Sequence, residues 1–432
     1  MVSPVADIYT VPSGTTSVQA GRGVSLPPPP PAGPSVAYAM GSQACWTWFT
    51  APVAVHRNGA TYIGAMDNIG RTVVYKYTHA TSTSESFFLW PTSVEGDDHD
   101  NPAITFLPNG RVVAAYSMHN DTSGFRYRIS TNPEDISAWG PEVVVSPGGD
   151  TVAYTRLQYL SSVNRYYNVY RANIGRRRII STADFVTWDT ARDCIRTGLS
   201  GDYNCYTQGF GNGVDRIDFF WNWTSPNNGA GLPTTLFHAY MMPSGTAGVE
   251  NFYSSDGTLI GTNGSLNHLT GTVVYDGNLT NGEGWVWNIT RGADGYPRVL
   301  FVRFETLNDH RYMYGRWTGS AWVTTQICLG GDNLSTNITY SGGLCFDAQN
   351  ENIVYASVQV GSSWEIQEWR TANNGATWSK FRDITTGSAS GVKNARPVSP
   401  RNHAGQAAVV WWSGTYANFY NFNTAAKGIG SA

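Results

Sequence analysis

Two of the eight histidines, His99 and His119, flank one short segment whose pattern predicts a hairpin. An apolar, strand-like run follows His99, a second such run precedes His119, and the turn Pro108–Gly110 lies between them. Folding the chain back at this turn brings the two ends of the segment to the same edge of a sheet. Both imidazoles can then face one pocket, and imidazole exchanges protons near neutral pH, so the pair predicts acid–base chemistry.

Two other interpretations of this segment stay open. A histidine that follows Asp97 and Asp98 is often only a hydrogen-bonded turn residue. Asp97, Asp98 and His99 could also be metal ligands, although no further ligand follows at a regular spacing. The sequence therefore names no cofactor and leaves a structural divalent cation as an alternative.

The elements that must position these residues are strands. Only 14% of the 432 residues are charged, 13% are aromatic, and the aromatic residues include 16 Trp and 24 Tyr. Glycine is abundant, with 47 residues, and no segment longer than one turn repeats with helical periodicity. This composition favours short strands and tight turns. A surface rich in Trp, Tyr and Asn would also suit sugar rings, although most of these aromatics are expected in the core.

Repeated turns indicate how the strands are organised. Three segments resemble the Asp-box turn S/T-x-D-x-G-x-T-W, namely Thr371–Trp378, Ser181–Trp188 and the more divergent Ser130–Trp139. The remaining Gly-containing turns recur at intervals that fit four-stranded sheets of about 50 residues. Dividing residues 41–432 by that length predicts a seven-bladed β-propeller.

The first 40 residues differ from this body. They contain a run of five prolines, Pro27–Pro31, which forms a stiff spacer without a packed core. We therefore expect an extended arm or tether over residues 1–40 and a propeller domain over residues 41–432. The N-terminus lacks a basic region followed by an apolar core, so we expect either that a leader was removed or that the protein leaves its cell by another route, such as virion assembly and lysis.

The net charge, the hydropathy and the cysteines limit the classes of partner and the possible disulfides. The net charge is −3 and the only basic run is Arg176–Arg178, so nucleic-acid binding is not expected. No run of 18 apolar residues occurs, which predicts no membrane-spanning helix. Among the five cysteines, Cys194 could pair with Cys205 and Cys328 with Cys345.

From Cys45 to Tyr416 the sequence resembles the BNR-repeat family that includes the ulvan lyases, polysaccharide lyases built on a seven-bladed β-propeller. The resemblance rests on an ordered series of segments: CWTWFTAPVAVHRNGATYIGAMD, DDHDNPAITFLPNGRVVAAYSMHN, AYTRLQYLSSVNRYYNVYR, FHAYMMPSGTAGVENFYSSDGTLI, NDHRYMYGRW, YSGGLCFDAQNENIVYAS, WEIQEWRTANNGATW, ARPVSPR and WSGTY. The arm before residue 40 has no counterpart in that family.

The resemblance implies a set of site residues. Tyr154 falls on the family's catalytic tyrosine and Arg171 on its carboxylate-binding arginine, with His99 and His119 on active-site histidines. It implies that Tyr154 and His99 transfer protons while His119 and Arg171 hold the carboxylate. The predicted substrate contacts are Tyr206, Gln208, Trp48 and Arg396.

Two departures bear on that resemblance. Asp100 stands where the family tends to have asparagine, and Gln208 stands where it often has a basic residue. If Asp100 faced the pocket, its negative charge would repel an acidic sugar.

The resemblance implies β-elimination of a uronate-containing polysaccharide by an extracellular or virion-surface protein. The alternative is a non-catalytic glycan-binding protein of a phage tail or capsid, anchored to other virion proteins by the arm. A third reading is a sialidase, which needs three arginines around a carboxylate; Arg171, Arg303 and Arg396 are the candidates.

Overall fold

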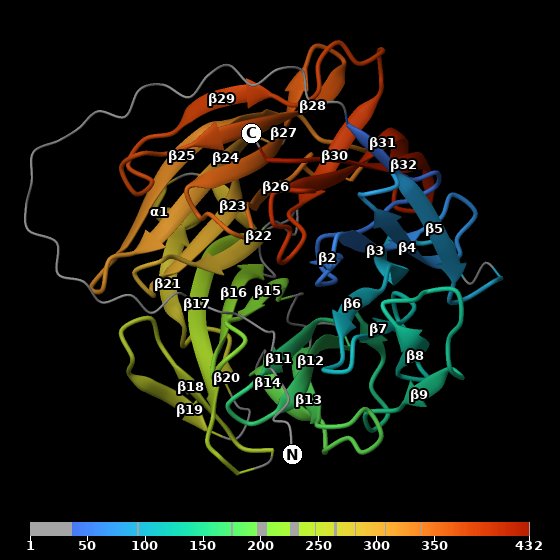
Figure 1. Ribbon diagram of the computed structural model, residues 1–432. Helices are drawn as coiled ribbons and strands as arrows, with labels where there is room; N and C mark the ends of the chain where they lie inside the picture. Colours follow the sequence, from blue (N-terminus) through green and yellow to red (C-terminus); the bar gives the residue numbers. More distant parts are fainter. Residues whose placement is uncertain are drawn as a thin grey trace, which may run out of the picture.

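The computed structural model describes residues 37–92, 95–173, 176–196, 205–224, 233–246, 248–262, 266–280, 282–306, 308–337 and 339–431. Within these ranges the chain is all-β, as predicted, with 32 strands. The described part contains one four-residue helix, α1 (Gly277–Thr280), and one 3₁₀ turn, η1 (Asp98–Asp100). The sheets surround a common centre in chain order, as the blades of a propeller do (Figure 1).

The strands pair into six sheets. Three sheets have four strands each: β2 (Ala54–Arg57), β3 (Ala60–Met66), β4 (Thr72–Thr78) and β5 (Thr83–Phe88); β6 (Ala103–Phe106), β7 (Arg111–Tyr116), β8 (Phe125–Pro133) and β9 (Val143–Val145); β22 (Glu283–Arg291), β23 (Pro297–Thr306), β24 (Asp309–Trp317) and β25 (Trp322–Gly331). Two sheets have six: β10 (Val152–Ala153), β11 (Leu157–Leu160), β12 (Arg165–Ala172), β13 (Arg176–Thr182), β14 (Arg192–Arg196) and β20 (Leu266–Asn267); β15 (Thr207–Gly211), β16 (Ile217–Thr224), β17 (Pro233–Pro243), β18 (Glu250–Tyr253), β19 (Leu259–Thr262) and β21 (Thr272–Asp276).

The last sheet has eight strands: β26 (Leu344–Phe346), β27 (Ile353–Val360), β28 (Ser363–Arg370), β29 (Ser379–Asp383), β30 (Lys393–Val398), β31 (Val409–Asn418), β32 (Asn421–Ile429) and β1 (Tyr38–Gly41). The prediction of seven separate blades is therefore wrong, because the described strands form six sheets. β28 and β30 pair in parallel at Trp364 and Lys393, which merges the C-terminal strands into one sheet. Turn spacing shows where the chain reverses but does not show which strands pair sideways.

The Asp-box segments form the expected turns. In Thr371–Trp378 the side chain of Asn373 accepts a hydrogen bond from the backbone N–H of Thr377 at 2.9 Å. In Ser181–Trp188 the Asp184 carboxylate accepts from the N–H groups of Val186 and Thr187, each at 2.8 Å. Such side-chain acceptors replace ladder hydrogen bonds where the chain turns.

The N-terminal and C-terminal ends of the described chain meet in the same sheet. Tyr38–Gly41 forms β1 and pairs antiparallel with β32 near residues 426–428. Met40 is fully buried there. This strand begins two residues before the expected boundary of the arm, and residues 1–36 lie outside the described residues.

All five cysteines are buried, and Cys45, Cys194, Cys328 and Cys345 are free. The predicted pairs Cys194–Cys205 and Cys328–Cys345 are therefore wrong. Cys194 and Cys205 belong to one apolar cluster, and burial raises the pKa of Cys194, Cys328 and Cys345. Buried thiols of this kind behave as small apolar side chains. No helix in the described residues is long and apolar enough to cross a membrane.

A buried ion pair connects the start of the second sheet to the last sheet. The Arg396 guanidinium donates to Asp98 at 2.6 Å and to the backbone carbonyl of Trp46 at 2.7 Å. Tyr416 donates to the same Asp98 oxygen at 2.7 Å. Arg396 and Asp98 are 1% and 0% exposed, so both charges are satisfied inside the protein rather than by water.

We predict that removal of β1 destabilises the ring. Deleting residues 1–41 removes the β1–β32 ladder and the buried Met40 side chain, which costs about 2–4 kcal/mol of unfolding free energy. Chemical denaturation measures the loss. Deleting residues 1–36 is the control, because it retains every described strand; a loss as large in the control would contradict the assignment to β1.

We predict that Arg396→Met costs about 3–5 kcal/mol of unfolding free energy, because it leaves the Asp98 carboxylate buried without a partner. The double variant Asp98→Asn with Arg396→Met should lose less than the sum of the single variants. Lys380→Met is the control, since the Lys380–Asp383 pair is exposed and costs about 0–1 kcal/mol. Additive single-variant losses would contradict a buried, coupled pair.

Candidate active site

The β6–β7 hairpin brings the two predicted histidines together. His99 lies in η1, just before β6, and His119 lies three residues after β7. The turn between the strands contains Gly110 at φ 82°, a backbone conformation that glycine adopts without strain. The two imidazole rings are stacked with centroids 4.2 Å apart and planes at 11°. The prediction that both rings reach the same place is confirmed.

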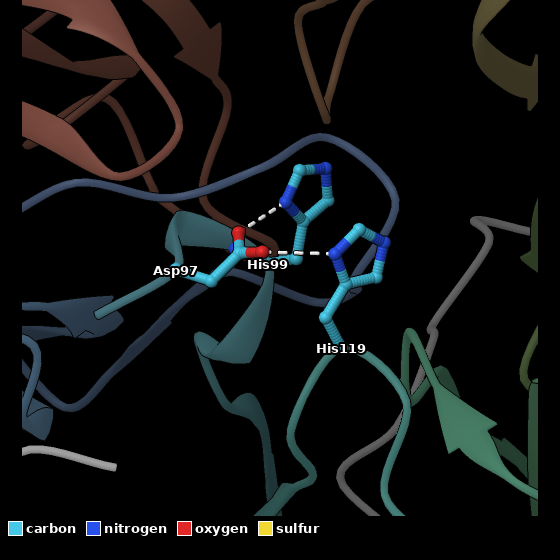
Figure 2. Close-up of side chains that lie close together, drawn as sticks. All are labelled: Asp97, His99 and His119. Carbon is cyan, nitrogen blue, oxygen red and sulfur yellow. Dashed lines mark hydrogen bonds and ion pairs between the residues drawn. The ribbon is translucent and has the colours of Figure 1, made fainter. Parts of the chain in front are cut away.

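One carboxylate holds both rings. Asp97 accepts a hydrogen bond from Nδ1 of His99 through one oxygen and from Nδ1 of His119, at 2.8 Å, through the other (Figure 2). An ionised carboxylate only accepts hydrogen bonds, so both Nδ1 atoms carry hydrogen. In the neutral rings the Nε2 atoms are then left as acceptors.

Each Nε2 atom meets a tyrosine hydroxyl. His119 Nε2 lies 2.8 Å from the Tyr154 hydroxyl, and His99 Nε2 lies 2.9 Å from the Tyr340 hydroxyl. Two chains of the form carboxylate–imidazole–phenol therefore start from one aspartate. A carboxylate that fixes the tautomer of an imidazole, which in turn contacts a phenol, is an arrangement able to move a proton.

Tyr154 and Arg171 come from the neighbouring sheet, on either side of the β10–β12 pair. Tyr154 follows β10 with φ 61°, the left-handed conformation that a bulky residue adopts only where the surroundings enforce it. Arg171, in β12, donates to the Tyr154 hydroxyl at 3.3 Å and to the Asn120 side chain at 2.7 Å. The guanidinium carbon lies 4.6 Å from the centre of the Tyr154 ring. The four residues predicted as catalytic therefore form one cluster.

Burial and charge set the protonation of this cluster. Burial would raise the pKa of Asp97, but the charge of His99 and the hydrogen bonds from both rings outweigh it and lower that pKa. Burial lowers the pKa of His119, and the hydrogen bond to Asp97 offsets only part of the effect. Burial raises the pKa of Tyr154, which the Arg171 charge offsets only in part. At neutral pH the resting pair is a neutral imidazole and a neutral phenol.

Exposure distinguishes the two histidines. The His119 side chain is 20% exposed and the His99 side chain 1%. Phe49 packs 5.9 Å from the His99 ring, and Phe419 contacts both imidazoles edge-on. A ligand that approaches from solvent therefore reaches His119 before His99.

The four residues predicted to contact substrate are placed differently. Tyr206 is half-buried and lies 4.7 Å from Phe49, beside the cluster. Trp48 stacks on Trp287 at 4.2 Å. Trp48, Gln208 and Arg396 are all buried.

Gln208 and Arg396 are committed to internal bonds. The Gln208 amide donates to the backbone carbonyl of Trp48 at 3.1 Å, and Arg396 binds Asp98. The structure thus places both beneath the site as supports, because a buried amide or guanidinium must find its partner inside the protein. Tyr206 alone of the four keeps a partly exposed side chain beside the cluster.

Asp100 is buried and presents no carboxylate to solvent beside the site. It is fully buried and has no hydrogen-bond partner for either carboxylate oxygen within the described structure. Burial, followed by the negative charges of Glu95 and Asp97, raises the pKa of Asp100 well above its usual range. This shift favours the neutral carboxyl group, which weakens the repulsion expected from the sequence.

The three arginines considered for a sialidase are not all available to bind one ligand carboxylate. Arg303 pairs with Glu305 at 2.7 Å, and Arg396 pairs with Asp98 at 2.6 Å. Only Arg171 has no carboxylate partner among the described residues. The arrangement therefore does not support a three-arginine site.

Asp97, His99 and His119 also satisfy the distance requirement of a metal site, with ligand atoms within 4.8 Å of one another. Both oxygens of Asp97 already accept hydrogen bonds from the ring nitrogens that would bind the ion (Figure 2). A metal would have to displace both hydrogens and would find three protein ligands. The observed bonding fits an acid–base group better than a metal centre.

Sequence reasoning missed three contributors to this cluster. Asp97 was considered only as a turn partner or metal ligand, whereas it orients both histidines. Tyr340 comes from the loop before β26, and Asn120 binds Arg171. Asn120 directly follows His119, so its position was a usable signal; nothing local in the sequence connects Tyr340 with His99, which is 241 residues away.

Three solved structures of polysaccharide lyases share this fold. An ulvan lyase of family PL25 bound to a -[GlcA(1-4)Rha3S]- segment superposes with a TM-score of 0.72 at 11% identity, covering 92% of this chain and 96% of that chain. A further structure of a PL25 ulvan lyase gives 0.70 at 12%, with the same coverage. The polysaccharide lyase Uly1 gives 0.56 at 13%, covering 91% of this chain and 97% of that chain. At such identities the likeness establishes the fold alone.

No curated protein sequence matches this chain. Residues 60–329, more than half of the chain, match the sequence profile described as BNR repeat-containing family member. The matched range begins in β3 and ends in β25, and it contains His99, His119, Tyr154 and Arg171. The chain therefore belongs to the BNR repeat-containing family.

Proposed function

We propose that this protein is a polysaccharide lyase that cleaves a uronate-containing polymer by β-elimination. The observation that carries the proposal is the contact between the His119 Nε2 atom and the Tyr154 hydroxyl, 2.8 Å apart, beside the Arg171 guanidinium. The shared fold of three polysaccharide lyases, one bound to a glucuronate-containing segment, supports the same substrate class.

Arg171 makes the C5 proton acidic enough to remove. Its guanidinium has no carboxylate partner among the described residues and contacts the Tyr154 hydroxyl. A uronate carboxylate bound there pairs its two oxygens with a planar, permanently charged group. The negative charge that develops on the carboxylate as the C5 proton leaves is then stabilised where it forms.

His119 and Tyr154 divide the proton transfers. Neutral His119 takes the C5 proton through Nε2, and the C5–H electron pair forms the C4–C5 double bond. The C4–O bond breaks, and Tyr154 gives its proton to the departing oxygen. The proton on His119 then passes across their hydrogen bond to the Tyr154 phenolate, which restores both groups. The lowered pKa of His119 keeps the imidazole in the neutral form that a base requires, and the raised pKa of Tyr154 keeps the phenol protonated.

This assignment gives the role of the base to His119 instead of His99. The sequence resemblance implied that His99 transfers the proton and that His119 holds the carboxylate. The greater exposure of His119 and its contact with Tyr154 favour it as the base. His99, bound to Asp97 and Tyr340, then keeps the shared carboxylate in place.

The competing proposal is a glycan-binding protein without activity, carried on a phage tail or capsid by the arm over residues 1–40. The burial of Tyr154 and Arg171, both 5% exposed, is the observation that favours it. A screen of ulvan, glycosaminoglycans, alginate and bacterial capsular glycans separates the two. Ultraviolet absorbance of new unsaturated uronide ends supports the lyase; binding without such ends supports the adhesin and contradicts the lyase.

We predict that His119→Ala and Tyr154→Phe each lower kcat about 10²–10⁴-fold on the polymer that the screen identifies, because each removes one partner of the proton transfer. The initial rate of absorbance increase measures the effect. Tyr159→Phe is the matched control, since the Tyr159 hydroxyl bonds Asn164 in a turn away from the cluster. A His119→Ala enzyme with unchanged kcat would exclude His119 as the base.

We predict that the acid limb of the kcat/KM profile is centred below pH 6.5. The base must be neutral, and the pKa of His119 is lowered from its ordinary value of 6.5, so protonation removes activity at a lower pH than for a free imidazole. A pH–rate profile measures the acid limb. An acid limb centred above 6.5 would contradict the assignment.

A further inference from the structure

Three arginine side chains line one small cavity behind Tyr154. Arg156, Arg171 and Arg177 share the lining with Phe49, Val169, Tyr170 and Thr207. Arg171 and Arg177 are direct partners in the β12–β13 ladder, and Arg156 precedes β11 in the same sheet. All three arginines are at least 95% buried, so the cavity gathers three guanidinium groups away from solvent.

None of the three pairs with a carboxylate of the described residues. Arg156 donates to the backbone carbonyls of Phe49, at 2.6 Å, and Thr207, at 3.3 Å. Arg177 donates through Nη1 to the carbonyl of Arg176, and its Nη2 has no partner. Carbonyl oxygens satisfy hydrogen-bond donors but do not cancel the charge.

The neighbours of Arg177 in the sequence show that pairing is available on this strand. Arg176 binds Asp193 at 3.0 Å, and Arg178 binds Asp150. Only the middle arginine of the run points inward and remains unpaired. Arg176 and Arg178 are partly exposed and ion-paired, whereas Arg177 is buried.

Three like charges in a buried space are costly unless an anion joins them. Burial lowers the pKa of Arg156 to about 9 and that of Arg177 to about 10. The charge of Arg177 contributes to the lowered pKa of Arg156, and the charge of Arg171 contributes to that of Arg177. Both directions agree with like charges that share one buried space.

The size of the cavity selects the anion. Its volume is about 10 Å³, which is room for one water-sized particle. A sulfate, a phosphate or a sugar carboxylate does not fit. We propose that Arg156, Arg171 and Arg177 hold a single monatomic anion, of which chloride is the abundant one, behind the Tyr154 phenol. This anion shares Arg171 with the proposed carboxylate site, and its binding requires no lyase activity.

Bromide replaces chloride at such sites and can be located by its anomalous scattering. Crystals of the full chain grown with sodium bromide should show one anomalous peak between the three guanidinium groups. The absence of a peak there in well-diffracting crystals would overturn the proposal, whatever the activity of the protein.

Thermal unfolding gives a second, independent readout. A ligand that binds only the folded state raises its stability by mass action. We therefore expect sodium chloride to raise Tm by about 2–4 °C over sodium gluconate at the same ionic strength. Arg177→Met should abolish this difference, and Arg176→Met, one position along the same strand, should retain it. An equal chloride effect in Arg177→Met and the unmodified chain would overturn the assignment.

Discussion

The buried contact between Asp98 and Arg396 is the constraint on which the site depends. It joins residues 298 positions apart, and Tyr416 completes it by donating to the same carboxylate. Asp98 lies between Asp97 and His99, so the ion pair fixes the peptide that carries both. An ion pair that is exposed to water contributes little to stability. A fully buried ion pair resists separation, because separation would leave each charge in the apolar interior without a partner. The position of the acid–base residues is thereby tied to the closure of the ring.

The charge of the site depends on how its acidic residues and Arg171 are partnered. Asp97 accepts hydrogen bonds from two imidazoles, burial favours the neutral form of Asp100, and Arg171 has no carboxylate partner among the described residues. An acidic ligand that reaches this surface therefore meets a guanidinium that is not neutralised by a carboxylate of the described chain. This balance suits an acidic sugar better than a neutral one.

The sequence predicted the parts of the site that one hairpin and one strand pair determine. His99 and His119 meet because the β6–β7 turn is short, and Tyr154 and Arg171 meet across β10 and β12. It did not predict Tyr340 beside His99 or Arg396 beneath Asp98, because those contacts arise only when distant sheets pack. The predicted number of blades is wrong for a related reason, because periodic turns do not reveal the sideways pairing of β28 with β30.

The pairing of β1 with β32 has a consequence for biosynthesis. The first described strand has to wait for a partner some 390 residues downstream. Until then the nascent chain exposes an unpaired strand edge and an apolar Met40 side chain, surfaces that invite association with other chains. Contacts this distant in the chain also form slowly. The protein therefore gains its final cooperativity only after β32 has been synthesised rather than sheet by sheet, and its yield in a cell depends on how well the incomplete chain is protected from association until then.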